Sequence, residues 1–374
     1  MSHEPPPRAR IPADVASLRD YERHAQAVLD EQAWAYFSGG AADELTLQDN
    51  VAAWSRWRLR SRVLQPLAGG HTRVTLGTQV LEHPIMLAPV AYQRMAHADG
   101  EIGTALAAAA QQAGLILSTQ SSTSLEAVAQ VVRDEPGRGP LWFQLYLQHD
   151  AAFNRALVAR AEAAGYEALV LTVDAPVHGA RDRERRAGFR LPAGIEAVNL
   201  KGLPPAPAAP STGSAVFDGL LRHAPGWDDV QTLIAQTRLP VWLKGVTHPD
   251  DARRARDLGV AGLIVSNHGG RTLDTMAATA DLLPELHAAV GDALPLIVDG
   301  GIRRGTDVLK ALALGARAVL IGRPCVHALA TSGALGVAHV IRLLRDELEI
   351  AMALTGTRSL DHLPPDLLAP PVAC

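Results

Sequence analysis

A histidine and an arginine, at positions 268 and 271, follow the same short apolar segment. The run Gly262-Leu263-Ile264-Val265 is short and rich in branched residues, which is typical of a buried strand, and it opens into Ser266-Asn267-His268-Gly269-Gly270-Arg271. Histidine is the side chain best suited to transferring a proton near neutral pH, and the planar guanidinium of arginine binds a carboxylate through two hydrogen bonds. The pair points to an acid substrate that loses a proton, although a capping loop whose histidine bonds to backbone explains the same six residues equally well.

The residues that could act with this pair depend on the fold, and strand and helix patterns alternate eight times from residue 84 onward. Apolar segments typical of parallel strands occur at 84–90, 115–119, 141–146, 168–174, 240–245, 262–267, 295–300 and 318–322. Alanine-rich segments with helical spacing lie between them. This alternation predicts an α/β fold, a (β/α)8 TIM barrel. A doubly wound open sheet is the alternative, but no Gly-x-Gly-x-x-Gly follows an early strand.

The rest of the chain is expected to form one domain, 1–374, around this barrel. Residues 1–83 predict an N-terminal helical segment and a hairpin, 84–340 the barrel, and 341–374 a C-terminal helix and tail. The connection after the fourth strand is long and rich in proline and alanine at its centre, 203–210, which is typical of a mobile lid on the catalytic side of a barrel. We place this lid loop at 175–226.

The composition favours small-molecule partners. The 374 residues include 35 Lys and Arg against 39 Asp and Glu, a formal net charge of -4, so no polycationic face for nucleic acid or an anionic membrane is expected. Two cysteines are too few for a disulfide framework. The N-terminal stretch lacks the apolar core of a signal peptide, and no later apolar run reaches bilayer length, so we expect a cytoplasmic protein without a membrane partner.

Polar residues gather where the predicted strands end, which in barrels is where the chemistry takes place. The seventh strand ends in Asp299-Gly300-Gly301 with Arg303 nearby, and the eighth in Gly322-Arg323. Barrels commonly bind phosphate at these two loops, and tight turning alone explains the glycines but not an arginine in each loop. The phosphate could belong to a substrate or to a nucleotide cofactor. The chain shows no metal cluster of closely spaced ligands, so a redox reaction would need an organic cofactor.

From about residue 21 to residue 363 the sequence resembles the FMN-dependent 2-hydroxy acid oxidase and dehydrogenase family, which includes glycolate, lactate and mandelate-type oxidases. The strongest matching motifs are 266–271 with Leu273-Asp274, 299–305 with Asp307, and Ile321-Gly322-Arg323-Pro324. Weaker ones are Phe143-Gln144-Leu145-Tyr146, Leu171-Thr172-Val173-Asp174 and Lys244-Gly245. All of them fall at the ends of predicted strands, in the family's order.

The resemblance implies a set of catalytic and substrate-binding residues. His268 matches the active-site base, and Asp174 the carboxylate that orients the imidazole and stabilises its protonated form. Arg271 and Arg181 match the arginines that hold the substrate carboxylate. Position alone favours a packing role for Tyr36, but the resemblance implies that this tyrosine and Tyr146 contact the substrate carboxylate and hydroxyl.

The resemblance also implies that the cofactor is FMN. Residues that would lie against the flavin ring are Pro89, Val90 and Ala91, and those that would hydrogen-bond its polar edge are Ser118, Gln144 and Thr172. Lys244, one of only three lysines, matches the cation that stabilises the negative charge of the reduced ring. The ribityl and phosphate contacts would come from Ser266, Asp299, Gly300, Gly301, Arg303, Gly322 and Arg323.

The expected reaction oxidises an (S)-2-hydroxy acid to the 2-keto acid, with molecular oxygen as the acceptor in family members that are oxidases. His268 could take either the α-hydrogen, as a proton, or the hydroxyl proton. Gln120 stands where an aromatic residue is common at the pocket wall, which disfavours glycolate and leaves lactate-like and mandelate-like acids open. A barrel isomerase acting on a phosphorylated substrate and a non-catalytic flavin-binding protein are the alternatives. The family resemblance further implies a homotetramer.

Overall fold

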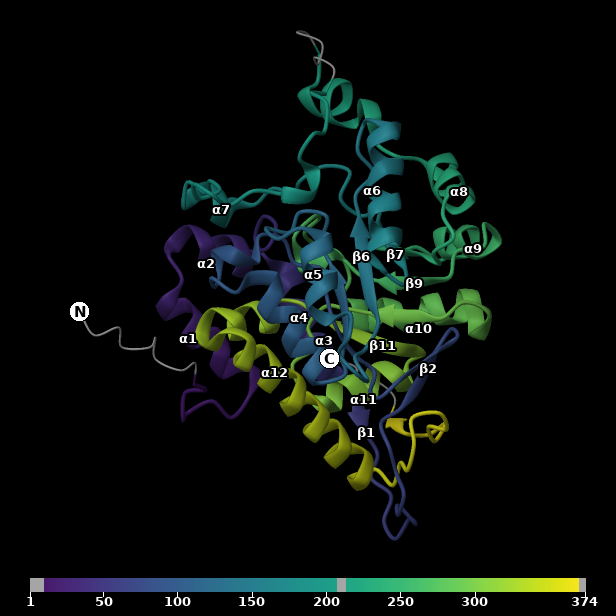
Figure 1. Cartoon of the computed structure of the whole chain (residues 1–374). Coiled ribbons are helices and arrows are strands. Elements are labelled where there is room, and N and C mark those ends of the chain that lie inside the picture. Colours follow the sequence, from purple (N-terminus) through teal and green to yellow (C-terminus); the bar gives the residue numbers. More distant parts are fainter. Residues whose placement is uncertain (1–9, 207–212, 370–374) are drawn as a thin grey trace, which may run out of the picture.

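Eight parallel strands close into a barrel at the centre of the protein (Figure 1). The structure, a computed structural model, describes residues 10–206 and 213–369. The strands follow one another around the barrel in chain order: β4 (Ile85–Leu87), β5 (Gly114–Leu117), β6 (Leu141–Leu145), β7 (Leu169–Thr172), β8 (Val241–Lys244), β9 (Gly262–Val265), β10 (Leu296–Val298) and β11 (Ala316–Ile321). All but one of their residues are buried, because side chains fill the inside and helices cover the outside. The predicted TIM barrel is confirmed.

Several strands end earlier than the sequence pattern indicates. The first was predicted to reach Val90, but β4 stops at Leu87, and Pro89 has no N–H with which to continue the ladder. The seventh was predicted to include Gly300, which instead turns away with φ 97°. Gln144, Thr172 and Lys244 still lie within their strands, whereas most of the other polar residues assigned to strand ends lie beyond them, in the loops that surround the barrel mouth.

Helices packed around the barrel form the outer layer. They are α4 (Gly100–Ala110), α5 (Leu125–Val132), α6 (Ala151–Ala164), α8 (Trp227–Gln236), α9 (Pro249–Asp257), α10 (Thr279–Val290), α11 (Gly305–Ala313) and α12 (Arg323–Leu354). Local sequence sets their ends: Asp150 accepts from the N–H of Phe153 at the start of α6, and Gly165 ends that helix at φ 90°. Each barrel strand is thus followed by a helix, which places all eight strand C-termini at one mouth.

The N-terminal segment covers two different parts of the barrel. Helices α1 (Leu18–Val28), α2 (Glu31–Ser38) and α3 (Leu45–Arg56) come first, and the hairpin of β2 (Val74–Leu76) and β3 (Gln79–Leu81) follows, with Gly77 in its turn as predicted. Gln79 hydrogen-bonds Glu167 just before β7, so the hairpin lies at the N-terminal end of the barrel. The short strands β1 (Arg58–Leu59) and β12 (Leu368–Ala369) pair with each other in antiparallel fashion.

The connection between β7 and β8 contains short helices rather than an irregular loop throughout. Its described part includes α7 (Asp182–Arg186), which packs on α2 and forms an ion pair between Arg183 and Glu44. In Figure 1 this teal segment stands at the top of the view, with α7 beside α2. Residues 207–212, within the proline- and alanine-rich centre, lie outside the described residues. Movement of 175–226 as a lid stays a prediction.

Helix α12 differs most from expectation. The sequence placed a boundary between barrel and C-terminal helix at 340, yet one helical segment runs from Arg323 to Leu354, bent where Ser332 and Gly333 leave helical geometry. By length and composition it is the one helix in the described part of the chain that could cross a membrane, so the expectation that no run is long enough is wrong. However, 67% of its most apolar window is buried inside the protein, where it packs against α1, α4 and α11. That burial is typical of a core helix.

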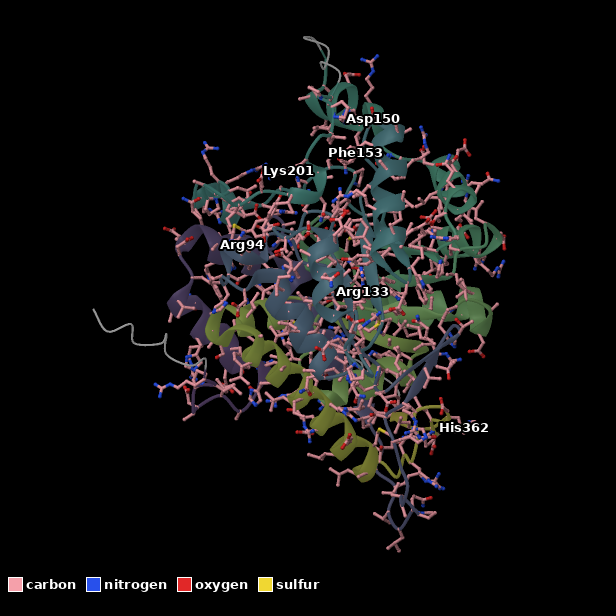
Figure 2. The ribbon with its side chains drawn as sticks, in the orientation of Figure 1. Arg94, Arg133, Asp150, Phe153, Lys201 and His362 are labelled. Carbon is pink, nitrogen blue, oxygen red and sulfur yellow. The ribbon has the colours of Figure 1, made fainter. Side chains whose placement is uncertain are left out.

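Charged side chains are spread over the outside of the protein. Figure 2 shows the exposed Arg94, Arg133, Lys201 and His362 on separate parts of the ribbon. Many surface charges are paired locally with the opposite sign, as in Arg160 with Glu126 at 2.8 Å. This mixture agrees with the near balance of acidic and basic residues in the sequence.

Candidate active site

A large cavity of about 1510 Å³ opens at the C-terminal ends of the barrel strands. The predicted site residues that line it are Tyr36, Pro89, Val90, Ala91, Ser118, Gln144, Tyr146, Thr172, Arg181, Lys244, His268, Arg271, Asp299, Gly300, Gly301, Arg303, Gly322 and Arg323. Asp174 and Ser266 are not in the wall but lie directly behind it, in contact with His268 and Lys244. The structure thus gathers every sequence-predicted site residue at one place.

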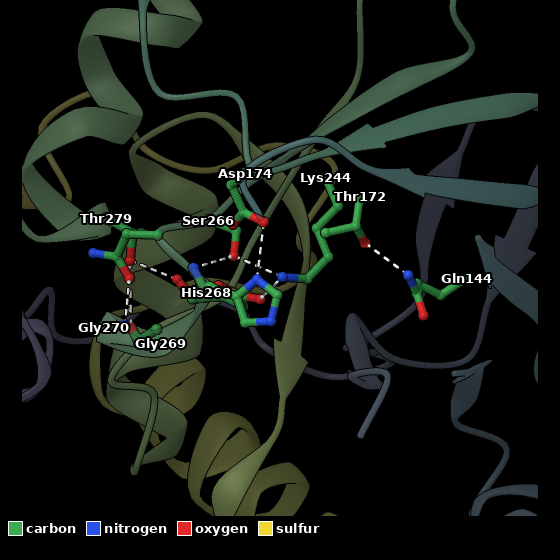
Figure 3. Close-up of polar contacts among 12 residues, drawn as sticks. Gln144, Thr172, Asp174, Lys244, Ser266, His268, Gly269, Gly270 and Thr279 are labelled. Carbon is green, nitrogen blue, oxygen red and sulfur yellow. Dashed lines mark hydrogen bonds and ion pairs between the residues drawn. The ribbon is translucent and has the colours of Figure 1, made fainter. Parts of the chain in front are cut away.

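His268 in the cavity wall and Asp174 behind it form a hydrogen-bonded pair (Figure 3). The Nδ1 atom of His268 lies 2.8 Å from Oδ1 of Asp174, whose side chain is 8% exposed. Gly245, at φ 102°, lets the neighbouring backbone pass beside the carboxylate, where a Cβ would come within 2.4 Å of Asp174. The Oγ of Ser266 accepts the backbone N–H of His268. With Nδ1 held by Asp174, Nε2 is the nitrogen left to exchange a proton with a ligand.

Burial and the contact between the two groups together set the protonation states that a general base needs. Burial lowers the pKa of His268, and the charge and hydrogen bond of Asp174 oppose that shift without cancelling it. Burial raises the pKa of Asp174, but His268 and Lys244 outweigh burial and keep the pKa of the carboxyl below its ordinary value. At neutral pH the imidazole is therefore neutral and the carboxylate is charged.

Catalytic efficiency is expected to rise with pH along an acid limb that lies below the ordinary histidine pKa of 6.5. The reason is that His268 accepts a proton only when neutral, and burial shifts its pKa downward, so protonation inactivates it only in acid. Measuring kcat/KM with a 2-hydroxy acid across the acidic and neutral range tests this. A limb centred at or above about pH 7 would contradict the assignment of His268 as the base.

Lys244 supplies a fixed positive charge at the bottom of the cavity. Its Nζ donates to Ser266 Oγ at 2.8 Å and lies 3.1 Å from Oδ2 of Asp299, and the Lys244 and Asp299 side chains are only 5% and 10% exposed. Burial lowers the pKa of Lys244, but Asp299 and Asp174 outweigh it and raise the pKa overall. The ammonium is therefore charged at neutral pH.

Two arginines from different segments line the cavity and contact the same carboxylate, Glu184. Arg271, just after the His268 turn, donates through Nη1 to the backbone oxygens of Tyr36 and Gly39, and its guanidinium carbon lies 5.0 Å from the centre of the Tyr36 ring. Arg181, at the start of α7, has a buried Nε with no partner among the described residues. Two guanidinium groups beside an imidazole are suited to binding a carboxylate next to the atom that loses a proton.

The two tyrosines complete this part of the cavity. Burial raises the pKa of Tyr36 to about 12, although Arg271 and Arg181 act in the opposite direction. Burial and the charge of Asp174 likewise raise the pKa of Tyr146. Both phenols are therefore protonated at neutral pH and can donate hydrogen bonds. Tyr36 also has the packing role that its sequence position favours, because its ring stacks on Phe189 at 4.8 Å and meets Phe37 edge-on at 5.2 Å.

Hydrogen-bonded polar side chains cross the barrel mouth from β5 to β7. Gln144 accepts from Ser118 Oγ at 3.3 Å and from the backbone N–H of Thr119 at 3.1 Å, and its Nε2 donates to Thr172 Oγ1 at 3.1 Å (Figure 3). The loop after β4 carries Pro89 along the same wall. Because its orientation is fixed by three partners, Gln144 is suited to recognising the polar edge of a planar ring.

Positive charge gathers at the loops after β10 and β11, which carry Arg303 and Arg323. Arg323 donates to the carbonyls of Gly269 and Gly39, each at 2.8 Å, and its Nε is buried without a partner among the described residues. Burial, with Arg271 and Arg303 nearby, lowers the pKa of Arg323 to about 9. Burial also lowers the pKa of Arg303. Crowded buried cations of this kind are stabilised by an anion, which agrees with the predicted phosphate site.

Sequence reasoning missed the residues that hold these loops in place. Asn50 of α3 and Asn267 exchange two buried amide hydrogen bonds, each 2.8 Å long, and Trp54 Nε1 donates to the carbonyl of Gly300 at 2.9 Å. No local pattern identifies these contacts, because their partners lie more than 200 residues away in the chain. Glu184 was also missed, although its position three residues after Arg181 in a helix is a sequence-level signal for an ion pair.

Alanine at Gly301 is expected to destabilise the protein far more than alanine at Gly77. Both glycines have positive φ, 80° and 61°, but a Cβ on Gly301 would lie 1.8 Å from the Asn50 carbonyl oxygen, whereas nothing lies within 4 Å at Gly77. Gly77→Ala should cost about 1 to 2 kcal/mol in the free energy of unfolding, and Gly301→Ala at least about 4 kcal/mol. Urea unfolding of both variants measures the difference; equal losses would contradict the close approach of α3.

The fold and the side chains at its mouth define a (β/α)8-barrel protein that combines an imidazole–carboxylate pair, two arginines suited to binding a carboxylate, and buried cations suited to an anion. The sequence matches the model of the FMN-dependent dehydrogenase family over residues 25–370. The chain belongs to this family.

Relatives and solved structures share nearly the full length of the chain. An L-lactate oxidase of Alicycliphilus denitrificans is 50% identical over 97% of this chain and 99% of its own, and a human 2-hydroxyacid oxidase 1 is 41% identical over 92% and 93%. The crystal structure of a mandelate oxidase with (S)-2-phenylpropionate matches with a TM-score of 0.84 and 40% identity, covering 93% of this chain and 96% of that one. The family resemblance inferred from the sequence motifs is confirmed.

Proposed function

We propose that this protein is an FMN-dependent oxidase that converts an (S)-2-hydroxy acid, lactate-like or mandelate-like, to the 2-keto acid and passes the electrons to molecular oxygen, giving hydrogen peroxide. The observation that carries this function is the convergence on one cavity of a neutral imidazole paired with Asp174 and two arginines beside it. The names of the relatives, lactate oxidase and 2-hydroxyacid oxidase among them, support the same class of reaction.

The residues present fit FMN. The cavity offers a buried cation at Lys244, a buried Nε on Arg323 and a buried Oδ1 on Asp299, and neither of these last two atoms has a partner among the described residues. These are the donors and acceptor that a flavin, a phosphate and a ribityl chain need, and Gly300 and Gly301 line the same cavity. The residues that would hold the cofactor are the separate positions that the sequence motifs predict, of which Pro89 is the first in the chain and Arg323 the last. When bound, FMN supplies the two-electron acceptor for the oxidation.

The chain's own residues then account for binding and proton transfer. Arg181 and Arg271 bind the carboxylate of the 2-hydroxy acid, and the protonated phenols of Tyr36 and Tyr146 donate hydrogen bonds to its carboxylate and hydroxyl oxygens. His268 Nε2 takes one proton, either from the α-carbon or from the hydroxyl. Asp174 stabilises the imidazolium that results. Loss of two electrons and two protons from the substrate gives the 2-keto acid.

The choice between lactate and mandelate depends on other residues that line the cavity. Gln120 lines the cavity and places an amide where an aromatic residue is common in the family, so the wall is more polar there. The L-lactate oxidase relatives favour lactate, and the mandelate oxidase structures keep an aryl substrate in consideration. A barrel isomerase acting on a phosphorylated substrate would share the anion loops but has no need for Arg181 and Arg271 beside His268, and a non-catalytic flavin protein has no need for the His268 pair.

Anaerobic addition of (S)-lactate or (S)-mandelate to the purified, FMN-loaded protein tests the function. Loss of the oxidised flavin absorbance is expected with at least one of them, and the (R) enantiomers serve as matched controls. Re-admission of air should restore the absorbance with formation of hydrogen peroxide. A flavin that no 2-hydroxy acid bleaches would support the isomerase or the non-catalytic protein, and bleaching without peroxide in air would contradict oxygen as the acceptor.

We also propose that the protein is a cytoplasmic homotetramer that binds neither membranes nor nucleic acid. The balanced surface charge supports the absence of polyanionic partners. The tetramer follows from the family resemblance. Light scattering of the FMN-loaded protein measures its mass, and a monomeric mass would contradict the tetramer.

A further inference from the structure

Glu184 is an internal carboxylate that contacts both arginines of the clamp. It lies in α7, three residues after Arg181, and its Oε1 is 3.2 Å from Nη1 of Arg181 and 3.2 Å from Nη2 of Arg271. The three side chains are only 14% to 15% exposed. One carboxylate oxygen therefore joins the two guanidinium groups in a place largely shielded from water.

The remaining donors of the two arginines show what Glu184 leaves for a ligand. Arg271 is anchored to the end of α2, where its Nη1 donates to the carbonyls of Tyr36 and Gly39. Arg181 uses Nη1 for Glu184, while its buried Nε finds no partner in the described ranges. The Nε side of a guanidinium can bind a carboxylate through two parallel hydrogen bonds. Glu184 thus holds Arg181 from one side and leaves the other side for the substrate.

The net charge of Arg181, Arg271 and Glu184 matches that of a ligand with one negative charge. Arg181 and Arg271 contribute two positive charges and Glu184 one negative charge, which leaves one positive charge to be balanced. A monocarboxylate balances it, whereas a dicarboxylate adds a second negative charge near Glu184. Because the group is mostly desolvated, charge interactions over several ångströms are stronger here than on the surface.

Building on the proposed function, we propose that Glu184 is a specificity-determining residue: it sets the net charge of the Arg181–Arg271 clamp so that monocarboxylate 2-hydroxy acids bind in preference to dicarboxylates. It acts through the two arginines and takes no part in proton transfer.

Glu184→Gln in the FMN-loaded protein tests this without turnover. Propionate and malonate are the probes, because they are a monocarboxylate and a dicarboxylate of the same carbon number that cannot be oxidised at a hydroxyl. Their dissociation constants are measured from the change that each ligand causes in the flavin absorbance spectrum. The wild type is expected to prefer propionate, and the ratio of the malonate to the propionate dissociation constant should fall about tenfold in Glu184→Gln.

Two control variants separate charge from structure. Glu184→Asp keeps the charge and should keep a ratio near that of the wild type. Arg183, on the same helix as Glu184, pairs with Glu44 and not with either arginine of the clamp, so Arg183→Gln removes that ion pair and should leave the ratio unchanged. Equal weakening of both ligands in Glu184→Gln, or loss of binding of both while Arg183→Gln still binds them, would overturn the charge role in favour of simple support of α7.

The inference and the function on which it rests fail in different ways. If (S)-lactate or (S)-mandelate still reduces the flavin but the ratio does not change in Glu184→Gln, the inference alone is wrong. A wild-type protein that binds neither propionate nor malonate and is reduced by no 2-hydroxy acid would overturn both.

Discussion

Replacing His268 with asparagine is expected to slow flavin reduction by a 2-hydroxy acid about a thousandfold to ten-thousandfold while FMN stays bound. The amide cannot accept the proton that His268 Nε2 takes. Asparagine is chosen because His268 has φ 56°, and asparagine adopts this left-handed conformation more readily than alanine does. The groups assigned to the cofactor, Lys244 and Arg323 among them, do not depend on the imidazole for their contacts.

The measurement is the rate of flavin bleaching after anaerobic mixing with substrate, together with the FMN content of the purified variant. His24→Asn is a matched control, since His24 pairs with Asp14 on the outside of the protein and should be replaceable without effect on the rate. Reduction of His268→Asn at the wild-type rate would show that another group takes the proton, and loss of FMN would show that His268 has a structural role instead.

The barrel could be predicted because its strands and helices are encoded by local patterns. The segments 125–132, 151–164 and 279–290, between predicted strands, form helices as their spacing predicts, and caps such as Ser124 and Asp150 mark where two of them begin. The last residue of each strand was harder to predict, because alternation alone does not indicate where the chain turns away from the sheet, as it does near Pro89 and Gly300. The sequence pattern divides this region at 340, whereas the helical geometry of α12 is interrupted at Ser332 and Gly333, where Gly333 has φ 57°.

The site was partly predictable for a different reason. The motif residues lie at strand ends, and a closed barrel brings strand ends together, so Asp174 and His268 meet although 94 residues separate them. What the sequence does not encode locally is the support from outside the barrel strands. The amide pair of Asn50 with Asn267 and the contact of Glu184 with Arg271 each join segments whose approach depends on how α3 and α7 pack. Such contacts become visible only once the tertiary structure is known.

Asp174→Asn is expected to slow flavin reduction about a thousandfold and to move the acid limb of the pH profile to lower pH. The carboxylate stabilises the imidazolium that forms when His268 accepts the proton, and a neutral amide cannot do so. Because the charge and hydrogen bond of Asp174 raise the pKa of His268 against the effect of burial, their loss lowers that pKa further. The variant should therefore be slow at every pH yet reach its own plateau in more acidic solution; a limb moved to higher pH would contradict this arrangement.

A double variant decides whether Asp174 acts through His268 or independently of it. If the carboxylate works only by orienting and charging the imidazole across their 2.8 Å contact, then Asp174→Asn should have no further effect once His268 is asparagine. The flavin reduction rate of the double variant should equal that of His268→Asn within a factor of about three, rather than the product of the two losses. Multiplied losses would mean that Asp174 contacts substrate or cofactor by itself. Because Asp174 lies behind the cavity wall and not in it, we expect the shared loss.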